Sequence, residues 1–546
     1  MSNIIKYLKN KKPSARELLC CFCVGGIFSA FELIGKVMSD AMNALNWRSN
    51  IVYFVLVALG MGAGIYLFYN FLDYMQCNKN DDKNSSWSMK KIFLVVFMCW
   101  LPYCLLSYPA RFGGGSHFQL KQYLGMETNA RIYSSIVYDG YYITNHHPVF
   151  LTYLYGFFYD IGEWMGNVNR GMFLLSILIL LLSAVSMTYA LVSLRRYVSQ
   201  KVFRFVLVFV CMYPVYGIYS YTICKDNLFA SALLVFSTCL LEIYYSKGKC
   251  LEGKFFSKGF MTICVVVPFL KHQGLIIVLV SLLSIVFVAG TFGRKILWNA
   301  GVVIVVYSVL FTNIFMPVMK IAPGGRQEAL SIPFQQTAYC VKHYGEEMSE
   351  EERAVINEIL PVEEIGYLYE EERADAVKFT FRQDTTSAEL VDYFYVWLKQ
   401  FLKYPIGYAK AFFEMNYGYY YLGFKDGIFD LYQSVDVGGI STPNWTQELF
   451  VRAEQLWEFM CNLTGIGVLF RTAVMTWLMF VSLFYCIYKK RYRRIIVLTP
   501  VILSFAVCLL SPWNGVYRYE LPIICAFPIM SCVLSANEEH EGRCRI

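Results

Sequence analysis

The sequence predicts a polytopic α-helical membrane protein. Hydrophobic residues make up 57 % of the 546 residues and charged residues only 16 %, whereas soluble domains carry roughly 25 % charged residues. The apolar residues gather in many long runs, each near the ~20 residues that a helix needs to cross a bilayer. The alternating pattern of a transmembrane barrel is absent. The class of protein is therefore set by the apolar runs, and the basic links between them indicate its topology.

Three apolar runs open the chain, at about 18–38, 51–73 and 92–108. The segment before them carries several lysines: Lys6, Lys9, Lys11 and Lys12. Because loops rich in Lys and Arg stay in the cytoplasm, we place the N-terminus inside and residues 109–170 outside. The segment 148–161 is apolar and aromatic but too short to span, so it predicts an interfacial or re-entrant helix.

The central part predicts helices at 171–194, 203–221, 227–246 and 296–317. Between them, the stretch 259–291 reads as one long helix or as two helices broken at 271–274. One helix would carry Arg294 and Lys295 to the outside, whereas two helices keep both inside. We therefore predict the pair, which brings Lys271 and His272 near the outer face.

The C-terminal part begins with a polar, glutamate-rich segment, 318–465, in which 388–402 predicts an amphipathic helix. Three helices follow, at 466–488, 494–511 and 519–536, and the total is about twelve spans. The predicted units are N-terminal transmembrane helices, a first external loop with interfacial helices, central transmembrane helices, a mixed and mostly helical extracytoplasmic domain, and C-terminal transmembrane helices with a short cytoplasmic tail: 1–108, 109–170, 171–317, 318–465 and 466–546.

The net charge of +8 does not indicate a nucleic-acid partner, because the cations cluster beside the apolar runs. Four polar clusters fall at the outer ends of helices in this topology. They are the first external loop, Lys225-Asp226, Lys271-His272 and Arg518-Tyr519. Ionisable groups at membrane depth are costly and usually mark function. Their common side of the membrane predicts one shared site.

His146-His147 could form a metal pair, a general acid and base, or a phosphate contact, because histidine titrates near neutral pH and binds metals. The alternative is a loop pair that bonds backbone carbonyls. Asp139 is a further external carboxylate, and such loop aspartates are usually just solvated.

Lys225 could hold a phosphate while Asp226 serves as base or metal ligand. The alternative is a local ion pair at a helix N-terminus, which the helix dipole favours. Arg518 could grip a diphosphate with its planar fork, or lie in an interfacial aromatic belt. Snorkelling would explain Lys271 without a functional role.

Several short motifs, weak singly, have a specific order and spacing together. They are Tyr108-Pro109, Gln119 with Gln122, Asn145-His146-His147-Pro148, Cys224-Lys225-Asp226-Asn227-Leu228-Phe229, Lys271-His272-Gln273-Gly274, Leu330-Ser331-Ile332-Pro333-Phe334-Gln335-Gln336-Thr337-Ala338, Tyr404-Pro405 and Arg518-Tyr519-Glu520-Leu521-Pro522. From about residue 90 onward, the chain resembles the bacterial DUF6020 family of multispanning proteins. That family is similar to GT-C glycosyltransferases, including the protein mannosyltransferase-like and aminoarabinose transferase-like enzymes.

The resemblance implies that a polyprenyl-phosphate-linked sugar enters from the outer leaflet and is transferred to a cell-surface glycan, lipid or protein. It implies a site facing the outside of the plasma membrane. Basic residues would hold the lipid phosphate, and a carboxylate in the first external loop would activate the acceptor or orient a divalent metal ion. We assign catalytic roles to Asp226, Asp139, His146 and His147. Phosphate or substrate contacts are assigned to Lys225, Arg518, Tyr519, Gln119, Lys271 and His272.

One position departs from that pattern. GT-C relatives usually carry an acidic residue shortly after the Tyr-Pro pair, and Gly115 stands there in this sequence. Either Asp139 or Asp226 substitutes, or the activity is lost or changed. The alternative function is a lipid-sugar flippase or transporter, which would place its site at the membrane midplane.

Overall fold

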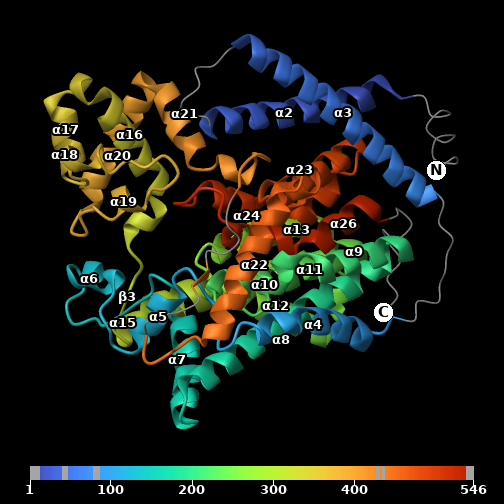
Figure 1. Cartoon of the computed structure of the whole chain (residues 1–546), viewed down its shortest axis with the longest axis horizontal. Coiled ribbons are helices and arrows are strands. Elements are labelled where there is room, and N and C mark those ends of the chain that lie inside the picture. Colours follow the sequence, from blue (N-terminus) through green and yellow to red (C-terminus); the bar gives the residue numbers. More distant parts are fainter. Residues whose placement is uncertain (1–12, 40–46, 78–86, 426–430, 433–436, 537–546) are drawn as a thin grey trace.

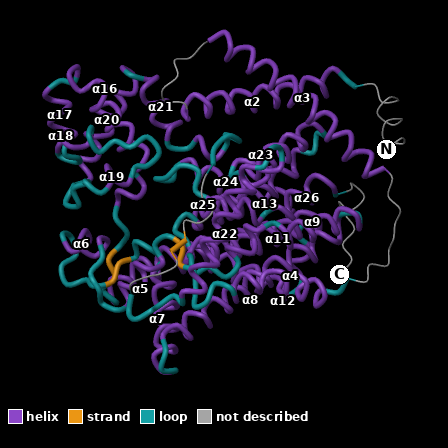
Figure 2. The backbone as a smooth tube through the Cα atoms, in the orientation of Figure 1, coloured by secondary structure: helices purple, strands orange, loops and turns teal. Residues whose placement is uncertain are grey.

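The computed structural model describes residues 13–39, 47–77, 87–425, 431–432 and 437–536 (Figure 1). The lysines of the first twelve residues and the predicted tail after residue 536 lie outside this described part. The described chain is mostly helical (Figure 2). Within it, seven stretches are long and apolar enough to cross a membrane: Ala15–Ser39, Asn50–Tyr74, Val168–Tyr197, Lys225–Ser246, Gly274–Val318, Tyr492–Leu509 and Tyr517–Ser535. The protein is therefore a multi-pass membrane protein.

The twelve predicted spans exceed these seven because several predicted helices are broken or short. The span predicted at 203–221 is wrong as one helix: it divides into α9 (Gln200–Met212) and α10 (Pro214–Tyr219). Tyr213 is extended there because a residue before proline avoids the helical region. The last predicted span, 519–536, is one of the seven, although a turn at Ala526 separates its two helices, α25 (Tyr517–Cys525) and α26 (Phe527–Ser535). Near it lie α23 (Ala473–Tyr488) and α24 (Thr499–Leu509).

The stretch 259–291 is two helices, as predicted. They are α12 (Lys254–Leu270) and α13 (Gly274–Ala289), and the link 271–273 carries Lys271 and His272. The chain turns again near Gly290, whose φ is +56°, and continues through α14 (Gly293–Val303), a π-helical segment (Ile304–Phe315) and α15 (Met316–Val318). The charge argument thus found the break that periodicity left open.

Helix α11 (Lys225–Ser246) is the centre of the membrane part, and nearly all of its residues are buried. It packs against α8 (Val168–Tyr197), α12, α13 and α25, and α4 (Met89–Leu105) also packs against α8. A helix that is apolar on all sides is expected in such a buried place. The first residues of α11 are therefore fixed by neighbours on every side.

An N-terminal hairpin of α2 (Ala15–Ser39) and α3 (Trp47–Cys77) lies along one side of this core (Figure 1). The two helices approach closely at Gly25, where a Cβ atom would collide with the Ala58 carbonyl oxygen. Beyond this contact, the hairpin and Phe413 border an apolar groove of about 460 Å³.

The segment predicted to be the first external loop contains α5 (Ser116–Tyr123), α6 (Asn129–Ser135) and α7 (Val149–Trp164). Two short strands fasten it. Strand β1 (Phe112–Gly113) pairs antiparallel with β4 (Leu431–Tyr432), and β2 (Ile143–Thr144) pairs parallel with β3 (Ile321–Ala322). Helix α7 covers the predicted segment 148–161 and exposes Trp164 at 87 %. Its interfacial position remains a prediction.

The polar segment builds a helical unit with its own core around Phe334, Ile356 and Tyr393. Its helices are α16 (Ser331–Tyr344), α17 (Glu350–Asn357), α18 (Val362–Ile365), α19 (Asp375–Lys378), α20 (Ser387–Lys403) and α21 (Pro405–Glu414). Helix α20 matches the predicted amphipathic helix and begins with a capping box between Thr386 and Glu389. By contrast, α22 (Asn444–Asn462) contributes Trp457 to the core of the membrane part.

Backbone hydrogen bonds join this helical unit to the segment before α25. The Ala374 N–H donates to the Pro512 carbonyl oxygen at 2.9 Å, and the Asn514 N–H donates to the Glu372 carbonyl oxygen at 3.0 Å. Together with β2 and β3, these bonds place the residues 372–378 beside the first turns of α11 and α25.

Candidate functional site

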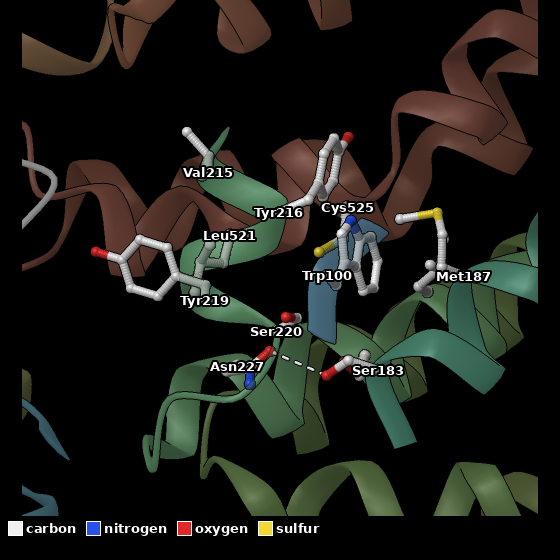
Figure 3. Close-up of a pocket in the computed structure, with 12 residues that line it drawn as sticks. Trp100, Ser183, Met187, Val215, Tyr216, Tyr219, Ser220, Asn227, Leu521 and Cys525 are labelled. Atoms are coloured by element: carbon white, nitrogen blue, oxygen red, sulfur yellow. Dashed lines mark hydrogen bonds between the residues drawn. The ribbon is translucent and has the colours of Figure 1, made fainter. Parts of the chain in front are cut away.

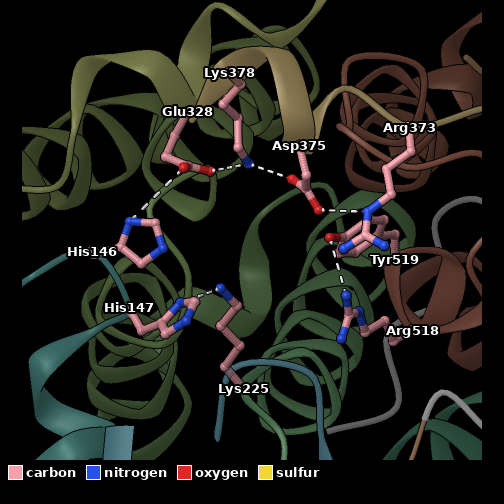
Figure 4. Close-up of polar contacts among 9 residues, drawn as sticks. All are labelled: His146, His147, Lys225, Glu328, Arg373, Asp375, Lys378, Arg518 and Tyr519. Carbon is pink, nitrogen blue, oxygen red and sulfur yellow. Dashed lines mark hydrogen bonds and ion pairs between the residues drawn. The ribbon is translucent and has the colours of Figure 1, made fainter. Parts of the chain in front are cut away.

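Four sequence-distant segments contribute polar side chains to one cluster, which Figure 4 draws without Lys271 and Asp226. The loop before α7 provides His146 and His147, and the first residue of α11 is Lys225. Arg518 lies in the first turn of α25, and Lys271 lies in the α12–α13 link. The structure thus brings together residues from all four clusters that the sequence singles out.

Asp226 and Lys271 form the most buried ion pair of this cluster. Lys271 Nζ lies 2.6 Å from Asp226 Oδ1, and the two side chains are only 9 % and 1 % exposed. The Cys224 thiol lies 3.5 Å from the other carboxylate oxygen. Removing one partner of such a pair leaves an uncompensated buried charge, which typically costs about 3–5 kcal/mol. Asp226 is therefore committed to joining α11 to the α12–α13 link.

Lys225 and His147 form the second close pair, with Nζ 2.9 Å from Nδ1. An ammonium group can only donate, so Nδ1 accepts and the imidazole proton lies on Nε2. Burial, followed by the nearby Lys225, holds the pKa of His147 well below its usual value. His147 is therefore neutral at pH 7, and the pair carries the single positive charge of Lys225.

The Gly113-Gly114-Gly115 turn packs directly on these groups. A Cβ atom on Gly115 would lie 2.6 Å from His147 Nε2, and one on Gly114 would overlap the Arg518 guanidinium. Gly115 also has φ +85°, a left-handed conformation that favours glycine. The ring of His147 therefore occupies the space beside Gly115 where the family resemblance implies an acidic side chain.

His272 and Gln119 hold the loop in place. The His272 Nε2–H donates to the Asn145 carbonyl oxygen at 2.8 Å, so Nδ1 accepts from the Tyr307 hydroxyl at 2.9 Å. Gln119 donates to the Pro148 carbonyl oxygen at 3.1 Å and to Thr152 at 3.2 Å, and it is 2 % exposed. Both side chains contact the backbone on either side of His146-His147.

Aromatic rings flank the cations near α25. The Arg518 guanidinium lies 5.0 Å from the Tyr519 ring centroid and 5.9 Å from that of Trp513. Lys271 Nζ lies 5.2 Å from the Tyr519 ring, and the Arg373 guanidinium lies 4.5 Å from the Trp513 ring. Cations within about 6 Å of a ring face are stabilised by its quadrupole. Trp513 is thus shared by one arginine from each part of the molecule.

Sequence reasoning missed a charged chain that the helical unit adds to the site (Figure 4). Lys378 Nζ lies 3.1 Å from Glu328 and 2.9 Å from Asp375, and Arg373 Nε lies 3.0 Å from Asp375. Burial opposes the charge on Lys378, but the two carboxylates outweigh it and raise the pKa of Lys378. Glu328 Oε1 in turn lies 4.0 Å from His146 Nδ1.

Asp139 lies elsewhere. It is exposed in the turn between α6 and β2, and none of the contacts found among the described residues joins it to the cluster.

Burial, followed by Lys121 and Arg518, lowers the pKa of His117 to about 4. His117 lies in α5, just after the glycine turn, so a second part of the loop also lies near the cations of the cluster.

The cluster as a whole carries an excess of positive charge. It holds five cations, Lys225, Lys271, Arg373, Lys378 and Arg518, and three carboxylates, Asp226, Glu328 and Asp375. Within the described ranges, no three His, Cys, Asp or Glu side chains gather closely enough to hold a metal ion. The arrangement therefore does not fit the divalent ion that the resemblance leaves open, and it fits an anion.

A small cavity lies deeper, beside the second turn of α11 (Figure 3). It is lined by polar groups such as Ser183, Asn227 and Ser231 together with Trp100, and its volume is about 20 Å³. That space holds about one water molecule. The cavity therefore has no room for a substrate-sized ligand.

Residues 81–545 match a family of unknown function, DUF6020. The chain belongs to the DUF6020 family. The match covers the membrane core, the helical unit and every residue of the cluster, whereas the described α2–α3 hairpin precedes it. No curated protein and no solved structure matches this family member.

We predict that Gly115→Ala destabilises this DUF6020 protein more than Gly125→Ala. Both glycines have a left-handed φ, +85° and +72°, but only Gly115 has a neighbour, His147, in the path of a Cβ atom. Left-handed strain alone costs about 1–3 kcal/mol, and the displaced imidazole adds to it. Thermal unfolding in detergent measures both variants. Equal losses would contradict the proposed packing of the turn on His147.

We predict that mild acid destabilises the protein through His272. Burial, followed by Lys225, lowers the pKa of His272 to about 4, whereas the unfolded chain titrates near 6.5. Between these values only the unfolded chain binds the proton, so stability falls as the pH drops from about 6.5 toward about 4. At about pH 5 this amounts to about 1–2 kcal/mol. His272→Gln should show a smaller loss of melting temperature between the two pH values, and an unchanged pH slope would oppose this account.

Proposed function

We propose that this protein is a GT-C-like glycosyltransferase with about twelve membrane crossings, whose site faces the outside of the plasma membrane. It would move a sugar from a polyprenyl-phosphate-linked donor to a cell-surface glycan, lipid or protein. The observation that carries the proposal is the cation-rich cluster where α11, α25 and the α12–α13 link begin or end, beneath the helical unit.

The cluster suits a departing phosphate. When the bond between a sugar and a phosphate breaks, negative charge develops on the leaving oxygen, and fixed cations there stabilise the transition state. Lys225 is held by neutral His147, and Arg518 is held by Tyr519 and Trp513. Both are therefore oriented before a ligand arrives, and they do not have to reorganise during the reaction.

The position of the cluster favours transfer over transport. Transport sites lie near the membrane midplane, where helices are interrupted. Here Lys225 is the first residue of α11, Arg518 the second residue of α25, and Lys271 follows the last residue of α12. A site at helix ends has access to one side, as a transferase acting on surface acceptors requires.

The two carboxylates that the sequence offers as the base are less suited to it. Asp226 is 1 % exposed and bound to Lys271 at 2.6 Å. Asp139 is exposed in a separate turn. Asp226 instead has a positioning role. Its ion pair with Lys271 joins the first turn of α11, which carries Lys225, to the α12–α13 link.

We predict that Lys225→Met and Arg518→Ala weaken the binding of polyprenyl monophosphate about tenfold or more each, because a charge-assisted hydrogen bond contributes about 1.5–3 kcal/mol. Native mass spectrometry of the detergent-solubilised protein with added polyprenyl monophosphate measures the bound fraction. Arg131→Ala is the matched control, since Arg131 lies outside the cluster and packs on Tyr142.

The same variants test the activity. Mass spectrometry of surface glycans, with and without the protein, should show a difference that Lys225→Met and Arg518→Ala abolish while the protein level in membranes holds. Unchanged surface glycans in the strain that lacks the protein would refute the glycan acceptor. Wild-type products in both variants would refute the assigned phosphate contacts.

A further inference from the structure

A base for the acceptor hydroxyl has to come from the side chains that face the cluster. Gly115 has no side chain, and His147 uses Nδ1 to accept from Lys225. His146 is the neighbouring imidazole, with its ring centroid 4.5 Å from that of His147. Its side chain is 23 % exposed, so a ligand can reach it.

Glu328 is the carboxylate that faces His146. It lies in the short helix Arg326–Ala329, just after β3, and β3 pairs with the strand that leads into His146. Lys378 binds Glu328 Oε2 at 3.1 Å. The other oxygen, Oε1, is buried, accepts no hydrogen bond from the described residues, and lies 4.0 Å from His146 Nδ1. A buried carboxylate oxygen without a donor is costly, and a protonated Nδ1 would satisfy it.

We propose that His146 takes the proton of the acceptor hydroxyl and that Glu328 positions it, an inference that rests on the proposed function. With the Nδ1–H directed to Glu328, the lone pair of His146 lies on Nε2, and in Figure 4 this second nitrogen faces the middle of the cluster. Catalytic bases commonly depend on a carboxylate that fixes the tautomer and stabilises the imidazolium.

The step balances as follows. The acceptor O–H bond breaks and its proton passes to His146 Nε2, while the acceptor oxygen forms a bond to the anomeric carbon of the sugar. The bond between that carbon and the phosphate oxygen breaks, and its electron pair leaves with the phosphate. Lys225 and Arg518 hold the phosphate anion, and Glu328 stabilises the imidazolium that forms.

The surrounding charges keep His146 in the state that a base requires. Burial lowers its pKa, Glu328 and Asp375 act in the opposite direction, and Lys225 and Lys378 lower it further. His147 and His272 also face the same site from the loop and the α12–α13 link. The net pKa lies below the usual histidine value, so His146 is neutral at pH 7.

The coupling between the two side chains is tested without substrate. Diethyl pyrocarbonate modifies neutral imidazole, so the rate of His146 labelling at several pH values, read by mass spectrometry, gives its apparent pKa. A charge at 4 Å contributes about 1–4 kcal/mol in surroundings between water and a protein surface, so Glu328→Gln should lower that pKa by roughly one pH unit.

Two controls separate this effect from a structural one. Asp375→Asn loosens the same Lys378, because the Asp375 ion pairs go to Lys378 and Arg373, and it should shift the His146 pKa less. Glu363→Gln removes a carboxylate that is 90 % exposed and should shift nothing. A shift in Asp375→Asn equal to that in Glu328→Gln, or no shift in Glu328→Gln, overturns the pairing of Glu328 with His146.

Activity provides the second test. If the pair works as proposed, His146→Phe abolishes the surface-glycan difference and Glu328→Gln reduces it at least tenfold, while both variants still bind polyprenyl monophosphate. Wild-type glycans in either variant overturn the pair but leave the proposed function standing, provided that Lys225→Met is inactive. If the wild-type protein makes no difference to surface glycans, the glycan acceptor fails and the labelling experiment still decides the coupling.

Discussion

The buried ion pair between Asp226 and Lys271 is the constraint on which the site depends. It joins the first turn of α11 to the link between α12 and α13 at 2.6 Å, in a place where neither side chain meets much water. Lys225 is the residue next to Asp226, and His272 is the residue next to Lys271. The pair therefore fixes, through two adjacent residues, the cation that meets His147 and the imidazole that meets the backbone of Asn145.

The glycine turn adds a second constraint, because neighbouring side chains occupy the space that side chains on its residues would need. Three glycines in succession let the loop backbone lie against Cys224, Arg518 and His147. A carboxylate on Gly115 would have to displace the imidazole of His147. The glycine at position 115 and the histidine at position 147 thus belong to one packing arrangement.

Much of the membrane part could be predicted from the sequence, because its signals are local. The apolar runs predicted the helices, and the positions of the basic links predicted the break at 271–273. Ionisable residues at predicted helix ends indicated Lys225, Asp226 and Arg518 as site residues. The break at Tyr213 also has a local cause, Pro214, but the long apolar run concealed it. The segment 388–402 was predicted because amphipathic spacing survives without any tertiary context.

The contribution of the helical unit could not be predicted in the same way. Glu328, Arg373, Asp375 and Lys378 lie among many charged residues of a polar segment, and no spacing sets them apart. Their roles follow from pairing across long sequence separations, such as that of β2 with β3 and that of Ala374 with Pro512. Only the fold shows that His146 and Glu328, far apart in the chain, face one another.

Trp513 has a consequence for how the two halves of the molecule communicate. Its ring is shared by Arg373 from the helical unit and Arg518 from the membrane part, and the flanking backbone is bonded to Glu372 and Ala374. Because both arginines pack on one ring, the position of Arg518 and the position of Arg373 are linked through Trp513. Coupling of this kind is reciprocal, so a ligand that bound more tightly when the helical unit is seated on Trp513 would favour that seating by the same factor.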